Sequence, residues 1–175
     1  MTGPPGAGKT TILRQLELDG FSVVEEAATD IIALWQAQGI AEPWKRHAFI
    51  DAVVSLQKAR EIYASCATDL IQFHDRSVIC TAALASYLGF PVSETLAREL
   101  KRAQSQNVFQ KKVFFIRNLG FITLTEARRI SFEETVRFER LHEQIYRDFG
   151  FEIISIGPGT VLDRVQKIKN ALQPA

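Results

Sequence analysis

The residues best suited to chemistry stand near the beginning of the sequence, in the stretch GPPGAGKT at residues 3–10. This stretch fits the pattern G-x-x-x-x-G-K-[ST] at every fixed position. Gly6 and Gly8 have no Cβ, so their backbone can take positive φ and come close to a ligand. Successive N–H groups then point inward and form a concavity for phosphate oxygens. The stretch therefore predicts a nucleoside triphosphate site.

The residue types at the end of this loop predict a role for each side chain. Lys9 is expected to reach the β- and γ-phosphates, and the Thr10 hydroxyl is expected to bind Mg²⁺. A helix predicted from Lys9 to Leu18 adds the positive end of its dipole to the same site. We therefore predict ATP and Mg²⁺ as cofactors, with the nucleotide held by Gly3, Pro4, Pro5, Gly6, Ala7, Gly8, Lys9, Thr10 and Thr11.

A second pair of candidate residues, Asp75 and Arg76, follows the apolar stretch LIQFH. A carboxylate at the end of a strand can join Thr10 in holding Mg²⁺, or it can orient the hydroxyl of an acceptor. Arg76 can clamp a phosphate or another anion through two parallel hydrogen bonds. The alternative is that Asp75 and Arg76 form a solvated ion pair. Because this pair lies two strands after the loop, we favour catalytic roles for Lys9, Asp75 and Arg76.

Residues 117–131, RNLGFITLTEARRIS, form a predicted lid over the nucleotide and carry Arg117, Arg128 and Arg129. Transfer of a phosphoryl group needs extra positive charge in the transition state, and an arginine from a lid supplies it. The lid also has to exclude water. We predict catalytic roles for Arg128 and Arg129, with a basic, solvated loop as the alternative.

Two further segments leave alternatives open. One of Glu25 and Glu26 is predicted to orient a substrate hydroxyl or amine, and the alternative is a negatively charged first turn of the next helix. The sequence does not choose between the two carboxylates. Residues 157–160, GPGT, are expected either to pass around the adenine or to form a plain turn into the last helix.

The elements that position these residues alternate between strand and helix. Apolar, β-rich stretches predict strands at 21–26, 70–75, 112–117 and 151–156, and residues with helical periodicity fill the segments between them. This alternation predicts a parallel sheet covered by helices on both faces, with the ligand at the carboxyl ends of the strands.

The beginning of the sequence is short for this architecture. The strand that feeds such a loop is normally central and about five residues long. Only Met1 and Thr2 precede Gly3, so we expect the first strand to be largely missing and Met1 to be an internal methionine of a longer reading frame.

Composition is that of a single compact domain over residues 1–175. Hydrophobic residues make up 46% and charged residues 23%, and the net charge is +1. We therefore expect neither nucleic acid nor a membrane as a partner. The sequence has no stretch for a bilayer span and no signal peptide, and a cytoplasmic location is predicted. Cys66 and Cys80 lie among apolar residues and are predicted to be buried free thiols.

Other nucleotide-hydrolysing classes lack support. The strand ends in Asp-Arg rather than the Asp-Glu pair of hexameric AAA+ motors, and the sequence has neither a guanine-recognition segment nor a transporter signature. The remaining layout is that of a small-molecule kinase or a related compact ATPase.

Several stretches together carry a family resemblance: GPPGAGKTT, VVEEAATDII, DRS, LDRVQKI and the segment from Thr125 to Ile156. The chain resembles the single-domain predicted ATPases of the AAA-like type, a group similar to the ribosylnicotinamide kinase domain and to nucleotide and nucleoside kinases. The resemblance implies a P-loop NTPase fold, a three-layer α/β sandwich with a parallel sheet of order 2-3-1-4-5, a kinase-type lid and Mg-ATP. It also implies Glu-x-x-Arg after the second strand, but Thr29 stands at the place of that arginine.

We therefore predict an ATP-dependent phosphotransferase that acts on a small hydroxylated metabolite, whose identity the sequence leaves open. A second hypothesis is an ATPase whose nucleotide state controls a protein partner. A third is a nucleotide-binding protein that has lost its chemistry.

Overall fold

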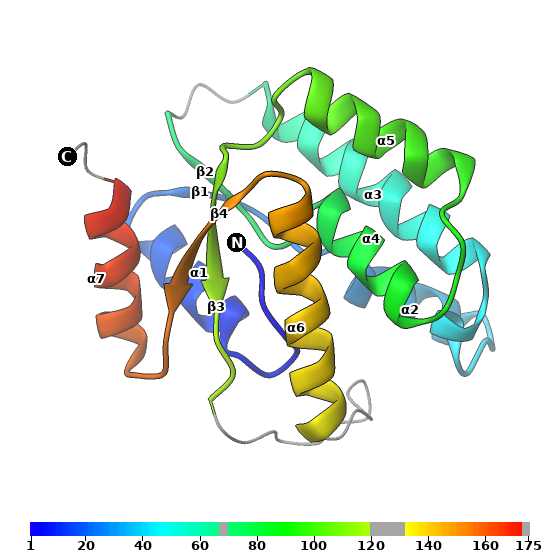
Figure 1. Ribbon diagram of the computed structural model, residues 1–175, viewed down its shortest axis with the longest axis horizontal. Helices are drawn as coiled ribbons and strands as arrows, with labels where there is room; N and C mark the ends of the chain where they lie inside the picture. The colour runs from blue at the N-terminus through cyan, green and yellow to red at the C-terminus, as the bar shows by residue number, and fades with distance from the viewer. Residues whose placement is uncertain (67–69, 120–131, 173–175) are drawn as a thin grey trace.

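The computed structural model describes residues 1–66, 70–119 and 132–172, in which helices alternate with short strands (Figure 1). A 3₁₀ turn, η1, precedes the third helix. In chain order the elements are α1 (Lys9–Leu18), β1 (Ser22–Val24), α2 (Ala28–Ala37), η1 (Pro43–Lys45), α3 (Ala48–Ala64), β2 (Gln72–His74), α4 (Val78–Tyr87), α5 (Glu94–Ser105), β3 (Lys112–Ile116), α6 (Phe132–Asp148), β4 (Glu152–Ile156) and α7 (Val161–Leu172).

The strands form two parallel pairs, β1 with β2 and β3 with β4. The first residues of the chain lie between the two pairs. Thr2 forms a parallel bridge with Phe115, and its N–H donates to the Phe114 oxygen over 2.9 Å. On the side of β2, the Met1 oxygen accepts from the Arg76 N–H over 2.9 Å. The parallel α/β class is confirmed, whereas the order 2-3-1-4-5 stays a prediction because the structure assigns two separate two-stranded sheets.

Helices α1 and α7 pack together and cover one face of the strands (Figure 1). Ile12 and Leu16 of α1 are fully buried there, and Val165 and Ile168 of α7 complete the contact. The strand side of this core comes from apolar residues of β2, β3 and β4, namely Phe73, Phe114, Ile116 and Ile156.

A second and larger core lies on the opposite face, among helices α2 to α6. Val113 of β3 faces this core while its neighbour Phe114 faces the first one, as the alternation of a strand requires. Residues 113–116 are all buried, which confirms the prediction that this apolar strand is covered on both sides.

The ends of some helices differ from the sequence-based expectations. Thr160 caps α7, because its Oγ1 accepts from the Asp163 N–H over 3.1 Å. Helical periodicity predicts a helix over residues 81–88, but α4 begins three residues earlier, at Val78. Cys80 is buried, but Cys66 is exposed at the end of α3, so the prediction of two buried thiols was wrong for Cys66.

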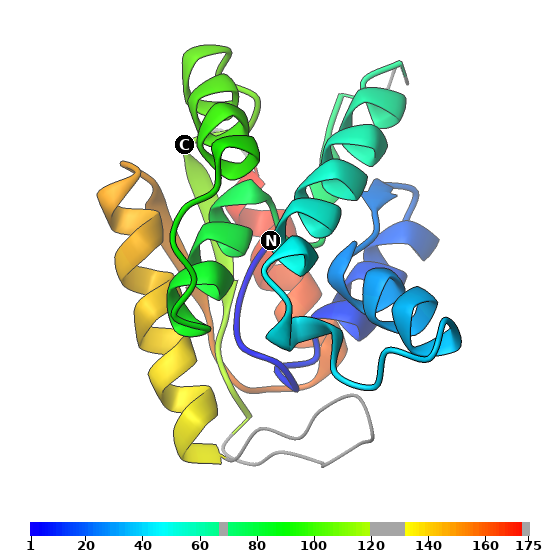
Figure 2. The same cartoon turned by 90° about the vertical axis from the view of Figure 1, so that its right-hand side faces the viewer.

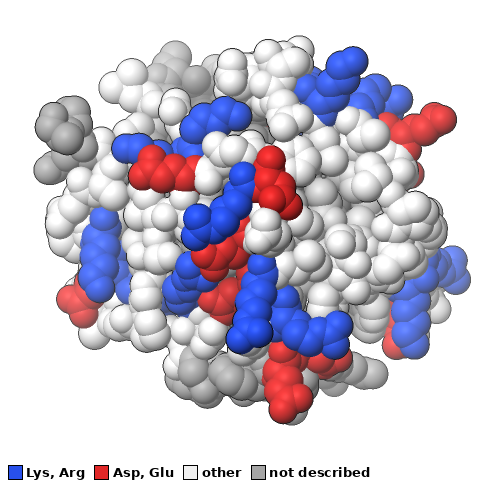
Figure 3. All heavy atoms as spheres, viewed as in Figure 1, with Lys and Arg blue, Asp and Glu red and all other residues white. Residues whose placement is uncertain are grey.

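Positive and negative side chains are mixed on the surface that Figure 3 shows, where Lys and Arg stand beside Asp and Glu. This mixture agrees with the net charge of +1. Within the described ranges, no helix has the length and apolar composition that crossing a membrane requires.

Candidate functional site

The loop of residues 3–8, drawn in dark blue in Figure 2, leads directly into α1. Gly3, Gly6 and Gly8 have φ of 141°, 78° and 81°, so the positive φ predicted for Gly6 and Gly8 is confirmed. At Gly3 a Cβ would come within 2.2 Å of the Ile116 carbonyl oxygen. The loop conformation and its packing against the end of β3 therefore both require glycine.

Lys9 begins α1 and its side chain folds back over the loop. Its Nζ donates to the carbonyl oxygens of Gly3 over 3.1 Å and Pro4 over 2.9 Å. Only 7% of the residue is exposed, and burial together with the nearby Arg76 cation lowers the pKa of Lys9 to about 8. Among the described residues, no carboxylate forms an ion pair with Lys9. The ammonium group is thus held by carbonyl oxygens, with Asp75 and Glu26 near enough to act on it only through their charge.

A cleft of about 220 Å³ lies beside the start of α1 and the ends of β1 and β2. Both residues predicted to bind Mg²⁺, Thr10 and Asp75, line it, whereas Thr11 is exposed outside this lining. The lining carries four carboxylates and one arginine: Thr10, Leu13, Arg14, Val23, Glu25, Glu26, Thr29, Asp30 and Asp75.

Asp75 follows β2 directly, and its backbone N–H donates to the Val24 oxygen over 2.8 Å. The residue is 6% exposed, and its Oδ1 has no hydrogen-bond partner among the described residues. Burial raises the pKa of Asp75, although the charge of nearby Lys9 opposes this shift. A buried carboxylate oxygen without a donor is costly, and a cation or a donor from a ligand would satisfy it.

Arg76 is held on two sides by protein groups. Its backbone has a φ of 73°, which is uncommon for a residue with a side chain. Its Nε donates to Glu26 Oε1 over 2.6 Å, and its Nη1 lies 3.4 Å from His142 Nε2. Burial would raise the pKa of Glu26, but the charges of Arg76 and Lys9 outweigh it and the pKa is lowered. Arg76 is therefore engaged in a partly buried ion pair beside the loop.

His142 of α6 is a functional neighbour that the sequence analysis missed. It is fully buried, and burial lowers its pKa well below the ordinary value, with the cationic Arg76 acting in the same direction. The neutral ring places Nδ1 3.3 Å from the Phe138 oxygen, so Nδ1 donates there and Nε2 accepts from Arg76. Its position four residues before the buried Tyr146 is the sequence signal that places it on the inner face of α6.

The structure distinguishes the two carboxylates that the sequence could not. Glu26 faces inward to Arg76, and its Oε2 also accepts from the Thr29 hydroxyl over 2.9 Å. Glu25 is about half exposed and pairs with Arg14. Arg60 of α3, another residue that the sequence analysis missed, donates to the Glu26 carbonyl oxygen and to Asp30. A guanidinium thus reaches this turn from α3, although Thr29 stands where the resemblance implied an arginine.

Of the three arginines predicted in the lid, the structure describes only Arg117, at the end of β3. It pairs with Glu139 and Glu143 of α6, and its guanidinium lies 4.5 Å from the ring centre of Phe115. Because carboxylates of α6 already pair with its guanidinium, Arg117 is not available as an unpaired cation for a phosphate. Arg128 and Arg129 lie outside the described residues.

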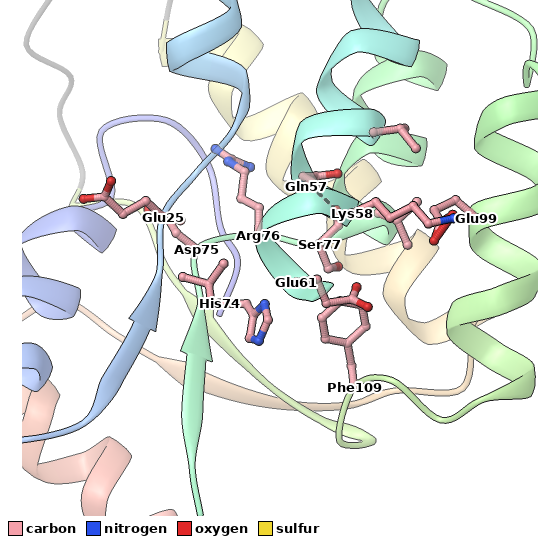
Figure 4. A pocket seen from close by; sticks show the side chains of 13 residues that line it. Glu25, Gln57, Lys58, Glu61, His74, Asp75, Arg76, Ser77, Glu99 and Phe109 are labelled. Carbon is pink, nitrogen blue, oxygen red and sulfur yellow. Dashed lines mark hydrogen bonds and ion pairs between the residues drawn. The ribbon is translucent and has the colours of Figure 1, made fainter. Parts of the chain in front are cut away.

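Two groups of charges flank the end of β2. The loop cluster consists of Lys9, Glu26, Asp75 and Arg76, and the α3–α5 cluster consists of Lys58, Glu61, Glu99 and Arg102. A small cavity of about 20 Å³ lies between them, with Asp75 and Arg76 on one wall and Lys58 and Glu99 on the other (Figure 4).

Among the described residues, no group of three or more His, Cys, Asp or Glu side chains is arranged to hold a metal ion by itself. A family model described as "AAA domain" matches residues 1–164 of the chain. No curated protein and no solved structure matches the sequence.

Proposed function

We propose a function for the chain on the premise that it belongs to the AAA domain family of nucleotide-binding P-loop proteins. The proposed reaction is the transfer of a phosphoryl group from Mg-ATP to a small hydroxylated metabolite. The observation that carries this proposal is the buried carboxylate of Asp75, whose Oδ1 has no partner among the described residues. This carboxylate shares one cleft with Thr10, at the head of the helix that follows the glycine-rich loop.

The donor set of the cleft fits a magnesium ion that is shared with phosphates. Mg²⁺ takes oxygen ligands and is usually held by one or two protein groups together with the oxygens of a nucleotide. The Thr10 hydroxyl and the Asp75 carboxylate supply such oxygens, and the unpartnered Oδ1 of Asp75 is satisfied when a cation is near. When bound, Mg²⁺ would neutralise charge on the phosphoryl oxygens.

Lys9 is the second support for the proposal. Both hydrogen-bond acceptors of its Nζ are neutral groups, the carbonyl oxygens of Gly3 and Pro4. Phosphate oxygens carry full negative charge and form stronger bonds with an ammonium group. We infer that Lys9 exchanges these carbonyls for phosphate oxygens when a nucleotide enters the loop.

The charge of the cleft supports a hydroxylated acceptor without a phosphate of its own. The lining has four carboxylates, and its one cation, Arg14, already pairs with Glu17 and Glu25. Carboxylates accept hydrogen bonds from hydroxyl or amine groups and repel anions. In this proposal the Asp75 carboxylate accepts the proton of an acceptor hydroxyl as that oxygen attacks the phosphorus.

The test is turnover of Mg-ATP by the full chain, with and without a panel of nucleosides and other polyols, following both ADP and the phosphorylated acceptor. We expect acceptor-dependent ADP formation that greatly exceeds hydrolysis in buffer. The Lys9→Met variant serves as the control for contaminating activity. Each active nucleoside is compared with its own monophosphate, and the monophosphate is expected to be the poorer acceptor.

The other outcomes correspond to the alternative functions. ADP formation that no acceptor stimulates contradicts phosphotransfer and favours the ATPase that controls a protein partner. Tight nucleotide binding with neither activity contradicts both and favours a nucleotide-binding protein without chemistry.

A further inference from the structure

Arg164 of α7 is a charged side chain in the interior that the proposed reaction does not use. It is 3% exposed, and burial lowers its pKa from the usual arginine value. Its Nη1 donates to the Ala7 carbonyl oxygen over 2.9 Å and its Nη2 to the Arg117 carbonyl oxygen over 3.3 Å. Among the described residues no carboxylate pairs with it, and its Nε has no partner. Removing a guanidinium from water costs free energy, and hydrogen bonds to two neutral carbonyl oxygens offset only part of this cost. The position of Arg164 therefore requires an explanation.

The bond to Ala7 fixes the direction of one peptide group in the loop. The structure has no cis peptide bonds among the residues it describes, and in a trans peptide the C=O and the following N–H point in opposite directions. Because Arg164 holds the Ala7 oxygen on the side of α7, the Gly8 N–H points to the other side. Gly8 is the N-cap of α1, where free N–H groups bind anions.

The arginine lies directly against this peptide. A Cβ built on Gly8 would come within 3.1 Å of Arg164 Nη1, so the loop glycine and the guanidinium pack without space between them. A rotated Ala7–Gly8 peptide would instead turn the carbonyl oxygen toward the anion site and remove one donor from it. A carbonyl in that place repels phosphate oxygens.

The second bond ties the arginine to the end of the β3–β4 pair. Arg117 follows β3, and its own N–H donates to the Ile156 oxygen of β4 over 2.9 Å. Its side chain is held by Glu139. Through Arg164, the Ala7 carbonyl is therefore anchored to the end of the β3–β4 pair as well as to α7.

We propose that Arg164 is a positioning residue that orients the Ala7–Gly8 peptide, so that the loop presents the Gly8 N–H to the phosphates of a nucleotide. This inference rests on the proposed nucleotide site. It assigns Arg164 no contact with the nucleotide, since Nη1 and Nη2 both donate to carbonyl oxygens of the protein.

The experiment compares Arg164→Met, which keeps the length of the side chain and removes its donors, with the control Lys169→Met. Lys169 also lies on α7 and forms an ion pair of 2.7 Å with Asp19 at the end of α1, far along the helix from the loop. Binding of Mg-ATP and inorganic pyrophosphate is measured by calorimetry, folding by circular dichroism, and the Gly8 amide shift by NMR.

We expect Arg164→Met to weaken binding of both ligands about tenfold, the loss of roughly one charge-assisted hydrogen bond. The downfield shift of the Gly8 amide proton on pyrophosphate binding should be lost as well. Lys169→Met should leave affinity and amide shift unchanged, although it loosens the same pair of helices. Should Arg164→Met not fold, Arg164→Lys is expected to show about threefold weaker binding, because its single ammonium nitrogen replaces only one of the two Nη groups.

A folded Arg164 variant with wild-type affinity and a wild-type Gly8 shift would overturn this inference alone. Equal losses in Arg164→Met and Lys169→Met would also overturn it, because packing of α7 on α1 would then explain both. A wild-type chain that binds neither Mg-ATP nor pyrophosphate would overturn the proposed function together with the inference.

Discussion

The loop cluster and the α3–α5 cluster contain the same kinds of charged residue, and both lie against the small cavity at the end of β2. In the α3–α5 cluster the charges are paired: Glu99 with Lys58 and Arg102, and Arg102 also with Glu61. In the loop cluster only Glu26 and Arg76 are paired. Lys9 is bonded to carbonyl oxygens, and Asp75 Oδ1 has no partner among the described residues.

The pKa shifts of the two clusters follow from this difference. Burial would raise the pKa of Glu99, but hydrogen bonds from Lys58 and Arg102 outweigh it and the pKa is lowered. For Asp75 burial is the larger effect, and the pKa is raised. A paired carboxylate is stabilised in its charged form. The charged form of Asp75 is destabilised by burial, and a bound cation would stabilise it. In the α3–α5 cluster paired charges thus join two helices, whereas the incompletely paired charges of the loop cluster line the candidate site.

The largest expected effect is on turnover in Asp75→Asn. An amide cannot accept a proton or bind Mg²⁺ as a carboxylate does, so we expect the rate of acceptor phosphorylation to fall about 100- to 10,000-fold. The free energy of unfolding near neutral pH should stay the same or rise, because the raised pKa means that the charged form of Asp75 opposes folding.

Steady-state turnover and urea unfolding measure the two quantities in this variant. Normal turnover would show that the carboxylate is structural and would remove the main distinction between the two clusters.

Lys9→Met should have the next largest effect, on nucleotide affinity. Removing the ammonium group deletes charge-assisted bonds to the phosphates, and we expect Mg-ATP to bind about 100-fold more weakly, or ~2.7 kcal/mol. Stability should not decrease, since Lys9 is buried without a carboxylate partner among the described residues. Calorimetry together with thermal unfolding tests both parts, and unchanged affinity in a folded variant would refute the phosphate role of the loop.

Glu99→Gln provides the contrast in the α3–α5 cluster. Loss of the negative charge leaves Lys58 and Arg102 without their shared partner, and we expect the free energy of unfolding to fall by about 2 kcal/mol. Affinity for Mg-ATP should be unchanged. Urea denaturation gives the first value and calorimetry the second. A loss of affinity without a loss of stability would mean that the two clusters act as one unit.

The smallest expected effect is a dependence of nucleotide binding on pH. The pKa of Lys9 in the free protein is about 8, and bound phosphates would raise it, so binding takes up a proton. Affinity for Mg-ATP should be nearly constant below pH 7 and fall about tenfold between pH 7 and pH 9.

Calorimetry at pH 8.5 in two buffers of different ionisation enthalpy measures this proton uptake. Lys9→Arg keeps the positive charge and does not titrate in this range, so it should show no uptake. Equal uptake by this variant would assign the proton to another group.

The sequence by itself determined the parts of the site that depend on local spacing. The loop pattern required positive φ at Gly6 and Gly8 and a helix starting at Lys9, because these follow from backbone sterics over a few residues. Asp75 could be predicted as a candidate because a polar residue at the end of an apolar strand lies at the edge where ligands bind. The buried strand Lys112–Ile116 was recognisable from its composition alone.

The tertiary structure decided which charges meet, because these pairs join residues far apart in the chain. Arg76 and Glu26 are 50 positions apart, and Arg164 and Ala7 are 157 apart, so no local pattern relates them. From the sequence, Arg76 was predicted to clamp an anion, with a solvated ion pair as the alternative, and Glu25 and Glu26 were equivalent. Packing pairs Arg76 with Glu26 and leaves Glu25 at the surface. The reason is physical: spacing fixes the direction of neighbouring side chains, but burial and the partners available in three dimensions determine which charges are satisfied.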